Sequence, residues 1–486
     1  MNLRFVAYVL SRLCFCNVVA LLVPLLTAVF LDRDQICTFV EAGFLSAFLG
    51  CVLAFWGREQ GRVRMNVKDA VMITGGGWLL VCVLGMFPYL FGMPELDLVT
   101  CLFESTSQWT TTGVTSLSGF GSLPLAFKVW RCVGHFLGAG GVILAFTMLM
   151  PEMRAGTDFI LASEMPGRSL EKTVPQIKKS ALLIVSIFVG LNLCQVLLLT
   201  FGGMNIWQAV NMAVSCVSTA GISFFGDGVM RFETAYFAVV CLFFMFLGGI
   251  NFNLWFKLLH RDWQALGRDA EWRYYTFWVL GSAVLLALGL WHGSVYDWGE
   301  SLQKGLMMSI SFLSTSGFAF DSISSWPDFC QLIFVLLSLT GGCSSSCSGG
   351  LKIIRCVIVM KAAWCEVRHF WHPNMTYTVH YGGQPVKSET VRQIVRFFFF
   401  YIFIAVLLML LGSCTGLSLR EAVTMVTGCM STAGCSLGSV DQESSYATVG
   451  IMPRFVAVLA MLLGRLEFTT LVAMLHPDFW RQKKGW

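Results

Sequence analysis

Residues 105–116 read "STSQWTTTGVTS" and interrupt a chain that is otherwise strongly apolar. The only bulky apolar residues among them are Trp109 and Val114. At the centre lies the kernel "TTTGV", residues 110–114, and three related kernels follow: "STAGI" at 218–222, "STSGF" at 314–318 and "STAGC" at 431–435. Successive kernels are about 100 residues apart, and related segments at a regular spacing indicate a fold built from internal repeats.

The composition is that of a membrane protein. Of the 486 residues 56% are hydrophobic and only 13% are charged, whereas soluble domains carry about 25% charged residues. The apolar runs reach about 20 residues, which is the length of a spanning helix, and they lack the alternation of a β-barrel. We therefore expect an all-α polytopic membrane protein, with spans at 9–30, 36–56, 70–92, 126–150, 181–203, 233–259, 274–292, 328–360, 393–414 and 448–475.

The distribution of positive charge predicts the orientation. Lys and Arg concentrate in the connections 57–69, 151–180, 260–273 and 361–392 and in the final "RQKKGW". By the positive-inside rule these segments are cytoplasmic. Arg4 and Arg12 place the N-terminus on the same side, so both termini are expected in the cytoplasm. The first apolar run lacks a small-residue cleavage site and is expected to stay in the protein.

The opposite connections, 94–125, 204–232, 293–327 and 415–447, each contain an amphipathic segment too short to span the membrane. Asp297 with Glu300 and Ser418 with Glu421 predict capping boxes, and Asp97 and Asn205 predict simpler N-caps. Each short helix should therefore end at a kernel and direct its partly negative C-terminal end toward the membrane centre. The repeated unit is helix, short helix, kernel and helix.

The kernels share the pattern Thr-x-Gly. Irregular backbone at membrane depth must be sheltered by protein or line a water-filled cavity. Four such segments around one axis would present carbonyls and threonine hydroxyls that can replace a cation's hydration shell, with glycine permitting the turns. The alternative is that small residues merely let helices pack closely, which we would favour for a single kernel. Four copies in the same context favour an ion site.

Several segments together carry a resemblance to a known family. They are "FESTSQWTTTGVTSL", "WRCVGHFLGAGGVILAFTMLMP", "VSTAGIS", "LSTSGF", "GGCSSSCSGGLKIIR", "STAGC" and "LGRLEFTTLVAMLHPDFW". The chain resembles the Trk/Ktr/HKT superfamily of potassium transporters, and most of all the transmembrane subunit of bacterial Trk systems. The resemblance covers essentially the whole chain. Any single kernel would be a weak signal, but the ordered combination is specific.

The resemblance implies four membrane–pore–membrane repeats around one pseudo-fourfold K⁺ pore, with two additional N-terminal helices. It also implies a homodimer in the bacterial inner membrane and a cytoplasmic nucleotide-binding regulatory ring (TrkA-like). The ion is the transported species, and no organic cofactor is expected. The corresponding domains are 1–62 for the N-terminal helices and 63–160, 161–268, 269–375 and 376–486 for the repeats.

The same resemblance assigns the selectivity filter by position. In plant relatives a serine at the first filter glycine accompanies sodium transport, whereas this chain has Gly113 there and glycine in the other three kernels, which favours K⁺. The implied filter runs to Val114, Ile222, Phe318 and Cys435. The implied K⁺-binding residues are Thr110, Thr111, Thr112, Gly113, Ser218, Thr219, Ala220, Gly221, Ser314, Thr315, Ser316, Gly317, Ser431, Thr432, Ala433 and Gly434.

Residues 340–352, "TGGCSSSCSGGLK", interrupt an apolar span, and glycine and serine at this density weaken a helix. The resemblance implies an intramembrane loop under the filter that acts as the gate. Cys343 and Cys347 have a spacing that could bind a metal, but no further ligand accompanies them. Lys352 and Arg355 are expected to snorkel toward the interface. The gate residues implied are Gly342, Cys343, Ser344, Ser345, Ser346, Cys347, Ser348, Gly349, Gly350, Lys352 and Arg465.

Arg465 lies near the middle of the last span. A structural pair with Glu467 is the alternative, but residues two apart on a helix do not face each other. Ionisable residues at membrane depth are usually functional. The resemblance places this arginine in the conduction path beside the gate, so we expect it just below the filter and in contact with residues 343–350.

Other acids have weaker assignments. Glu104, within the first short helix, is expected to anchor the filter through hydrogen bonds. Asp227, Asp321, Asp441 and Glu443 follow kernels and either line an outer mouth, where they would concentrate cations, or are ordinary loop charges.

The expected function is K⁺-selective uptake driven by the membrane potential. The alternatives are Na⁺- or H⁺-coupled symport and a less selective cation channel. A membrane enzyme would need convergent acids, a histidine near a nucleophile or a Cys-x-x-Cys motif, and the spans offer none. The sequence has no Gly-rich phosphate loop, so nucleotide control would come through a partner docked on 151–180, 361–392 and the C-terminal tail.

Overall fold

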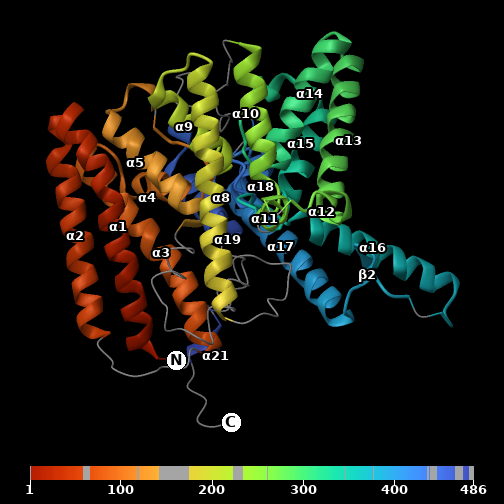
Figure 1. Cartoon of the computed structure of the whole chain (residues 1–486), viewed down its shortest axis with the longest axis horizontal. Helices are drawn as coiled ribbons and strands as arrows, with labels where there is room; N and C mark the ends of the chain where they lie inside the picture. Colours follow the sequence, from red (N-terminus) through yellow and green to blue (C-terminus); the bar gives the residue numbers. More distant parts are fainter. Residues whose placement is uncertain are drawn as a thin grey trace.

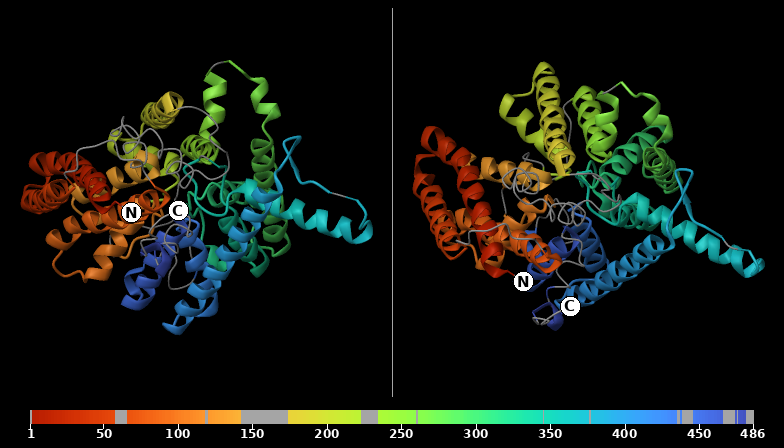
Figure 2. Two further views of the ribbon diagram at one scale, coloured as in Figure 1. Left: turned by 90° about the horizontal axis from the view of Figure 1, so that it is seen from below. Right: turned by 60° about the horizontal axis from the view of Figure 1, so that its bottom comes forward.

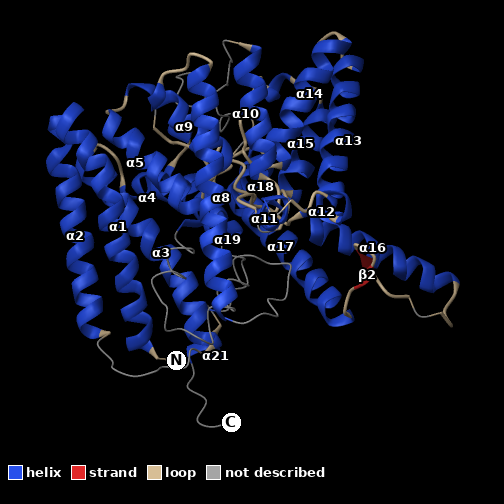
Figure 3. Ribbon diagram, in the orientation of Figure 1, coloured by secondary structure: helices blue, strands red, loops and turns tan. Residues whose placement is uncertain are grey.

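The computed structural model describes residues 2–57, 66–117, 120–141, 174–222, 234–259, 261–344, 346–375, 377–434, 437, 446–465, 474 and 476–480. Figure 3 shows that this part of the chain is almost entirely helical. Its strands, β1 (His380–Tyr381) and β2 (Gln384–Pro385), form one short antiparallel hairpin in which His380 pairs with Pro385.

The N-terminal part is a helical hairpin followed by the first helix of the first repeat. These helices are α1 (Leu3–Leu31), α2 (Ile36–Trp56) and α3 (Val67–Gly92). They are apolar and long enough to cross a membrane, as are α13 (Ala270–His292) and α17 (Ser388–Cys414). The spans predicted at 36–56, 70–92 and 274–292 are therefore confirmed to within a few residues.

The four short helices predicted in the outward connections are present. They are α4 (Leu98–Trp109), α9 (Ile206–Val217), α14 (Trp298–Leu313) and α18 (Leu419–Met430), and each ends at the residue immediately before a kernel. The Asp97 side chain accepts from Thr100 N at 2.8 Å, and Ser418 with Glu421 forms a capping box. The prediction of a capping box at Asp297 is wrong: Asp297 is the N-cap residue, but its side chain makes no capping hydrogen bond.

The remaining helices complete the repeats. They are α5 (Leu125–Phe136) with a π-helical turn (Leu137–Gly141), α8 (Val174–Phe201), α10 (Ala235–Gly248), α11 (Phe252–Leu259), α12 (Gln264–Arg268), α15 (Asp328–Thr340), α16 (Ile353–Trp371), α19 (Ile451–Arg465) and α21 (Pro477–Trp480). Residues 142–150 and 466–473 of the predicted spans lie outside the described residues.

The prediction of one continuous helix over 233–259 is wrong, because α10 ends at Gly248 and α11 begins at Phe252. The break occurs where the chain passes the end of α9, since a Cβ placed on Gly248 would lie 2.9 Å from the Val217 carbonyl oxygen. The predicted interruption of the span at 328–360 is confirmed, with α15 and α16 separated by residues 341–352.

The repeats surround a common centre. Figure 2 shows the helices of the four repeats grouped around the middle of the molecule, while α1 and α2 lie at one edge. On the opposite side, α16 and the β1–β2 hairpin project away from the rest of the protein (Figure 1). One hydrophobic cluster joins the second and third repeats, and a second cluster joins the N-terminal helices to the first and fourth repeats.

Candidate ion-conduction site

All four kernels have the same backbone conformation. The first residue of each is right-handed, with φ between −72° and −82°. The threonines that follow, Thr111, Thr219, Thr315 and Thr432, are left-handed, with φ of 57°, 54°, 57° and 58°. The glycines Gly113, Gly221, Gly317 and Gly434 also have positive φ, between 65° and 79°. Left-handed threonine is unfavourable for L-residues, so a shared structural requirement maintains it in every copy.

Hydrogen bonds hold the amide side of each kernel against its short helix. Thr112 N donates to Ser107 O at 3.0 Å, and in the second and third repeats Ala220 N and Ser316 N make the same bond at 2.9 Å. Alternating right- and left-handed residues turn successive N–H groups to one side of a chain. Because those N–H groups face the short helix, the carbonyl oxygens of the kernel face away from it.

The kernels are joined into a closed ring. A Cβ placed on Gly113 would lie 1.6 Å from the carbonyl oxygen of Ala220 in the next repeat, and the same construction on Gly221 lies 1.8 Å from Ser316 O. On Gly317 it lies 1.5 Å from Ala433 O. The last kernel returns to the first, since the Cβ on Gly434 would lie 1.9 Å from Thr112 O. Each glycine therefore contacts the third carbonyl of the following repeat.

The threonine hydroxyls are distributed unequally around the ring. Those of Thr111, Thr219 and Thr432 are buried and have no hydrogen-bond partner in the described part of the chain. The hydroxyl of Thr315 accepts from Gly349 N at 2.9 Å. A ring of carbonyls with free hydroxyls at one level has the oxygen chemistry that replaces water around a dehydrated cation.

A serine in each of the first three short helices fixes the outer end of its kernel. Ser107 donates to Val114 O at 2.6 Å, Ser215 to Ile222 O at 3.0 Å and Ser311 to Phe318 O at 2.8 Å. The corresponding residue of the fourth repeat is Gly428, which instead accepts from Gly434 N through its carbonyl at 3.0 Å. The fifth kernel residue of that repeat, Cys435, lies outside the described residues.

A buried ion pair stands behind the first kernel. Arg131 of α5 contacts the Glu104 carboxylate, and both side chains are 0% exposed. Glu104 accepts from Ser116 N at 2.5 Å and from Ser116 Oγ at 2.8 Å. Arg131 also donates to Val114 O. The prediction that Glu104 acts through hydrogen bonds is therefore confirmed, because it holds the residues that directly follow the first kernel. Sequence reasoning missed its partner, although an arginine in the apolar segment 125–136 was an available signal.

Replacing Glu104 with glutamine should leave the Arg131 charge buried without its counter-charge. Breaking a buried pair in this way costs about 3–5 kcal/mol, so we expect a much lower melting temperature in detergent. Glu389→Gln is the matched control, because Glu389 also faces arginines but is 60% exposed, where a pair contributes about 0–1 kcal/mol. The double variant Glu104→Gln/Arg131→Gln should recover part of the stability. Equal melting temperatures for Glu104→Gln and Glu389→Gln would contradict this assignment.

The loop between α15 and α16 lies directly under the ring. Besides the bond from Gly349 N to Thr315, a Cβ on Gly349 would lie 2.2 Å from Ser431 O and 2.4 Å from Thr432 Oγ1. On its other side Cys343 N donates to Gly249 O at 2.9 Å. Of the predicted gate residues, Ser345 lies outside the described residues. The loop therefore contacts the second, third and fourth repeats at the level of the kernels' inner ends.

Arg465 contacts this loop as expected. Its Nη1 donates to Cys347 O at 3.2 Å and its Nη2 to Gly138 O at 2.6 Å, so one guanidinium joins the loop to the first repeat. The neighbouring Gly464 lets α19 pass close to the end of α18, since a Cβ on Gly464 would lie 2.0 Å from Met430 O. The alternative partner, Glu467, lies outside the described residues.

Two expectations about charged residues are wrong. Lys352 and Arg355 do not extend to the interface, because they are only 9% and 7% exposed. Lys352 turns back into the loop and donates to Ser348 O, and Arg355 stacks 3.9 Å from the centre of the Phe397 ring. Both cations thus remain among the helices that carry the loop.

The outer acids receive little support as a cation-attracting group. Asp321 is engaged by Lys304 at 3.6 Å and accepts from Trp326 Nε1 at 3.3 Å and from the Tyr296 hydroxyl. Its charge is therefore already partnered. Asp227, Asp441 and Glu443 lie outside the described residues.

Sequence reasoning missed Glu271, which holds the other side of the loop. Its carboxylate accepts from Ser344 N at 2.5 Å, from Ser344 Oγ at 2.9 Å and from Asn251 Nδ2 at 3.2 Å. Glu271 was overlooked because it follows Arg268 and Asp269 and therefore resembles an ordinary charge of a cytoplasmic connection. The break between α10 and α11 brings Asn251 to it, and that break was not predicted.

Comparison with known proteins identifies the family. The model of the TrkH family, described as cation transport protein, matches residues 35–480. The chain belongs to this family. It is 28% identical over 486 residues to the Trk system potassium uptake protein TrkH of Salmonella typhimurium, covering 99% of this chain and 100% of the relative. It is 26% identical to the Trk system potassium uptake protein TrkG of Escherichia coli, covering 99% of each.

The solved structures agree with the fold. The chain superimposes on the crystal structure of the potassium transporter TrkH from Vibrio parahaemolyticus with a TM-score of 0.89. The sequences are 24% identical, and the match covers 99% of this chain and 100% of the other. The predicted fold, an all-α polytopic membrane protein with four membrane–pore–membrane repeats and two additional N-terminal helices, is thus confirmed, and so is the family resemblance.

Proposed function

We propose that this TrkH-family protein takes up K⁺ through the ring of four kernels. The observation that carries the proposal is the closed contact of each kernel glycine with the third carbonyl of the next repeat. The names of four relatives that match over their full length also support the proposal, because each is a Trk system potassium uptake protein. The K⁺-binding residues proposed are those of the four kernels, 110–113, 218–221, 314–317 and 431–434.

The preference for K⁺ over Na⁺ rests on two features of the ring. All four kernels have glycine at the fourth position, and each glycine is packed against a neighbouring carbonyl with no space for a side chain. The number and field strength of coordinating carbonyls decide which cation is dehydrated favourably. The short helices add the partly negative ends of four helix dipoles below the kernels.

In this proposal the membrane potential alone drives inward transport, without a coupled ion gradient. A membrane potential contributes about 2.3 kcal/mol per charge per 100 mV. Coupling to Na⁺ or H⁺ is the second candidate, and a less selective cation channel is the third. An enzymatic role has no support from the relatives, which are transport proteins.

The loop 342–350, with Lys352 and Arg465, is the proposed gate. The loop lies under the ring and is tied to it by Thr315, while Arg465 and Glu271 hold it from two sides. The Arg465 guanidinium adds a positive charge beside the path of a cation. Opening would require the loop to release these bonds together.

The proposed assembly is a homodimer in the bacterial inner membrane with both termini in the cytoplasm. The projecting end of α16 exposes Trp364, Phe370 and Trp371, which suits a protein interface. A nucleotide-binding ring would dock on the basic connections 151–180 and 361–392. The proposed domains are 1–62, 63–160, 161–268, 269–375 and 376–486.

Flux measurement in liposomes tests the function. Purified protein should carry K⁺ and Rb⁺ far faster than Na⁺ and Li⁺ into vesicles held at a negative internal potential. Equal K⁺ and Na⁺ flux would remove the selectivity proposal. Flux that persists only with a Na⁺ or proton gradient would favour coupled symport. No flux, even with a regulatory ring and nucleotide, would overturn the function.

A further inference from the structure

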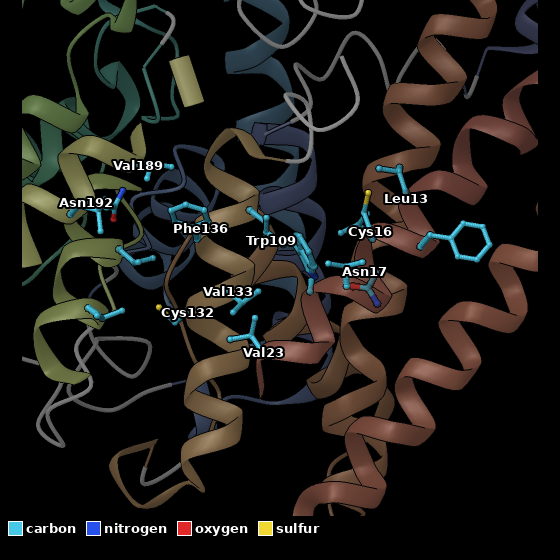
Figure 4. A pocket seen from close by; sticks show the side chains of 18 of the residues that line it. Leu13, Cys16, Asn17, Val23, Trp109, Cys132, Val133, Phe136, Val189 and Asn192 are labelled. Carbon is cyan, nitrogen blue, oxygen red and sulfur yellow. The ribbon is translucent and has the colours of Figure 1, made fainter. Parts of the chain in front are cut away.

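A lateral cavity of about 810 Å³ lies between the N-terminal helix and the first two repeats. Figure 4 shows Leu13, Cys16 and Asn17 approaching it from α1, with Val189 and Asn192 of α8 on the far side and Trp109 between them. Its volume is within the usual range of about 300–1,000 Å³ for ligand sites. The cavity is separate from the kernels and from the gate loop.

The opening of this cavity faces the membrane. Val19 of α1, a helix long enough to span the bilayer, and Leu193 of the apolar helix α8 line it and are 64% and 59% exposed. The two helices pack in different directions, α1 on α2, α3 and α5, and α8 on α9, α10 and α11. Figure 1 shows α1 and α8 as separate columns. The space between them therefore opens toward hydrocarbon rather than toward water.

The lining specifies an apolar occupant with an anionic end. Val, Leu, Phe, Ala and Cys side chains make up most of the lining. The amides of Asn17 and Asn192 donate within the protein, to Ser46 Oγ at 3.1 Å and to Phe188 O at 2.8 Å. Arg12 is the one charged residue among the described residues that line it, and it donates to the Tyr8 hydroxyl at 2.6 Å.

We propose that the cavity binds one acyl chain of an anionic phospholipid whose phosphate contacts Arg12. Arg12 lies in the third turn of α1, and its guanidinium reaches back one turn to Tyr8 while its stem lies along apolar surface. An arginine that reaches toward the interface in this way is placed to meet a lipid phosphate. A second copy of the chain fits less well, because the cavity is concave and the exposed aromatic end of α16 is on the opposite side of the molecule (Figure 1).

The lipid chain would support the first kernel. Trp109 lines the cavity, is the last residue of α4, and directly precedes Thr110. Its ring packs edge-on against Trp130 at 6.0 Å, and its carbonyl lies beside Gly138, where a Cβ would approach to 2.1 Å. Filling the cavity therefore buttresses the end of α4 on the side that faces away from the pore.

Native mass spectrometry of delipidated protein, titrated with phosphatidylglycerol or phosphatidylcholine, tests the proposal. We expect one phosphatidylglycerol per chain to bind preferentially. Arg12→Gln should weaken its binding by about tenfold, the effect of one charged contact, whereas Arg4→Gln, an exposed arginine of the same helix that does not line the cavity, should not. Val133→Trp, which fills the cavity, should prevent binding of both lipids.

Quenching by phospholipids with brominated chains gives a second readout, which uses conservative Trp→Phe variants and does not require the cavity to be filled. The quenching should fall in Trp109→Phe and stay unchanged in Trp326→Phe, since Trp326 is a buried tryptophan that does not line the cavity. Equal lipid binding by wild type, Arg12→Gln and Val133→Trp would overturn the proposal. The proposal would also be overturned if Val133→Trp became monomeric but still bound lipid, because a second copy of the chain would then be the occupant of the cavity.

Discussion

Replacing Gly317 with alanine should reduce K⁺ flux by at least about tenfold and lower the K⁺/Na⁺ flux ratio. The new Cβ would lie 1.5 Å from the Ala433 carbonyl oxygen, so one of the two kernels must move. The left-handed backbone at φ 71° adds about 1–2 kcal/mol of strain for a residue with a Cβ, and 1.4 kcal/mol alone corresponds to a factor of ten. Flux of K⁺, Rb⁺ and Na⁺ into liposomes measures the effect.

Gly416→Ala is the matched control for that substitution. Gly416 has a φ of 97°, and a Cβ built there meets nothing within 4 Å. It lies between α17 and α18, away from the kernels. This variant carries comparable backbone strain without a carbonyl contact, and it should retain wild-type selectivity. If Gly317→Ala transported K⁺ as selectively as Gly416→Ala at equal folded yield, the ring of kernels would not be the filter.

The repetition in the sequence explains why so much of the ring could be predicted. One Thr-x-Gly kernel indicates only a small-residue cluster, but four copies, each after a short helix, define both the unit and its number. Local signals sufficed for α4, α9, α14 and α18, because their caps and the kernel glycines mark the two ends of each helix. The ring, in contrast, is made by tertiary contacts that no local pattern encodes. Three of them join residues about 100 positions apart, and the one that closes the ring joins Gly434 to Thr112.

Two of the contacts that the sequence did not predict join polar residues that are distant in sequence. Arg131 and Glu104 are on different helices, and Glu271 meets the loop only through Ser344, 73 residues away. Lys352 was expected to snorkel toward the cytoplasmic interface because it follows the loop. It instead donates to Ser348 O within the loop. Burial reverses the usual preference of a lysine once a carbonyl is available inside the protein.

Replacing Arg465 with alanine should increase K⁺ flux, by about tenfold where the gate limits transport. The side chain joins Cys347 O of the loop to Gly138 O of the first repeat. Hydrogen bonds to a charged group contribute about 1.5–3 kcal/mol each, so their loss favours release of the loop by a factor of ten or more. Removing the positive charge also lowers the electrostatic barrier to a cation on that path.

Two further variants separate the contributions of charge and of bridging. Arg465→Lys keeps the charge but lacks the planar fork that reaches two carbonyls at once, so its flux should lie between those of wild type and Arg465→Ala. Arg454→Ala removes an arginine of the same helix that donates to Thr100 Oγ1 at 2.6 Å, far from the loop, and it should not raise flux. Unchanged or lower flux in Arg465→Ala, at normal expression and melting temperature, would show that this arginine is a structural link rather than part of the gate. A large rise in flux in Arg465→Ala, a smaller one in Arg465→Lys and none in Arg454→Ala would instead identify the bond between α19 and the loop as the element that holds the pore closed.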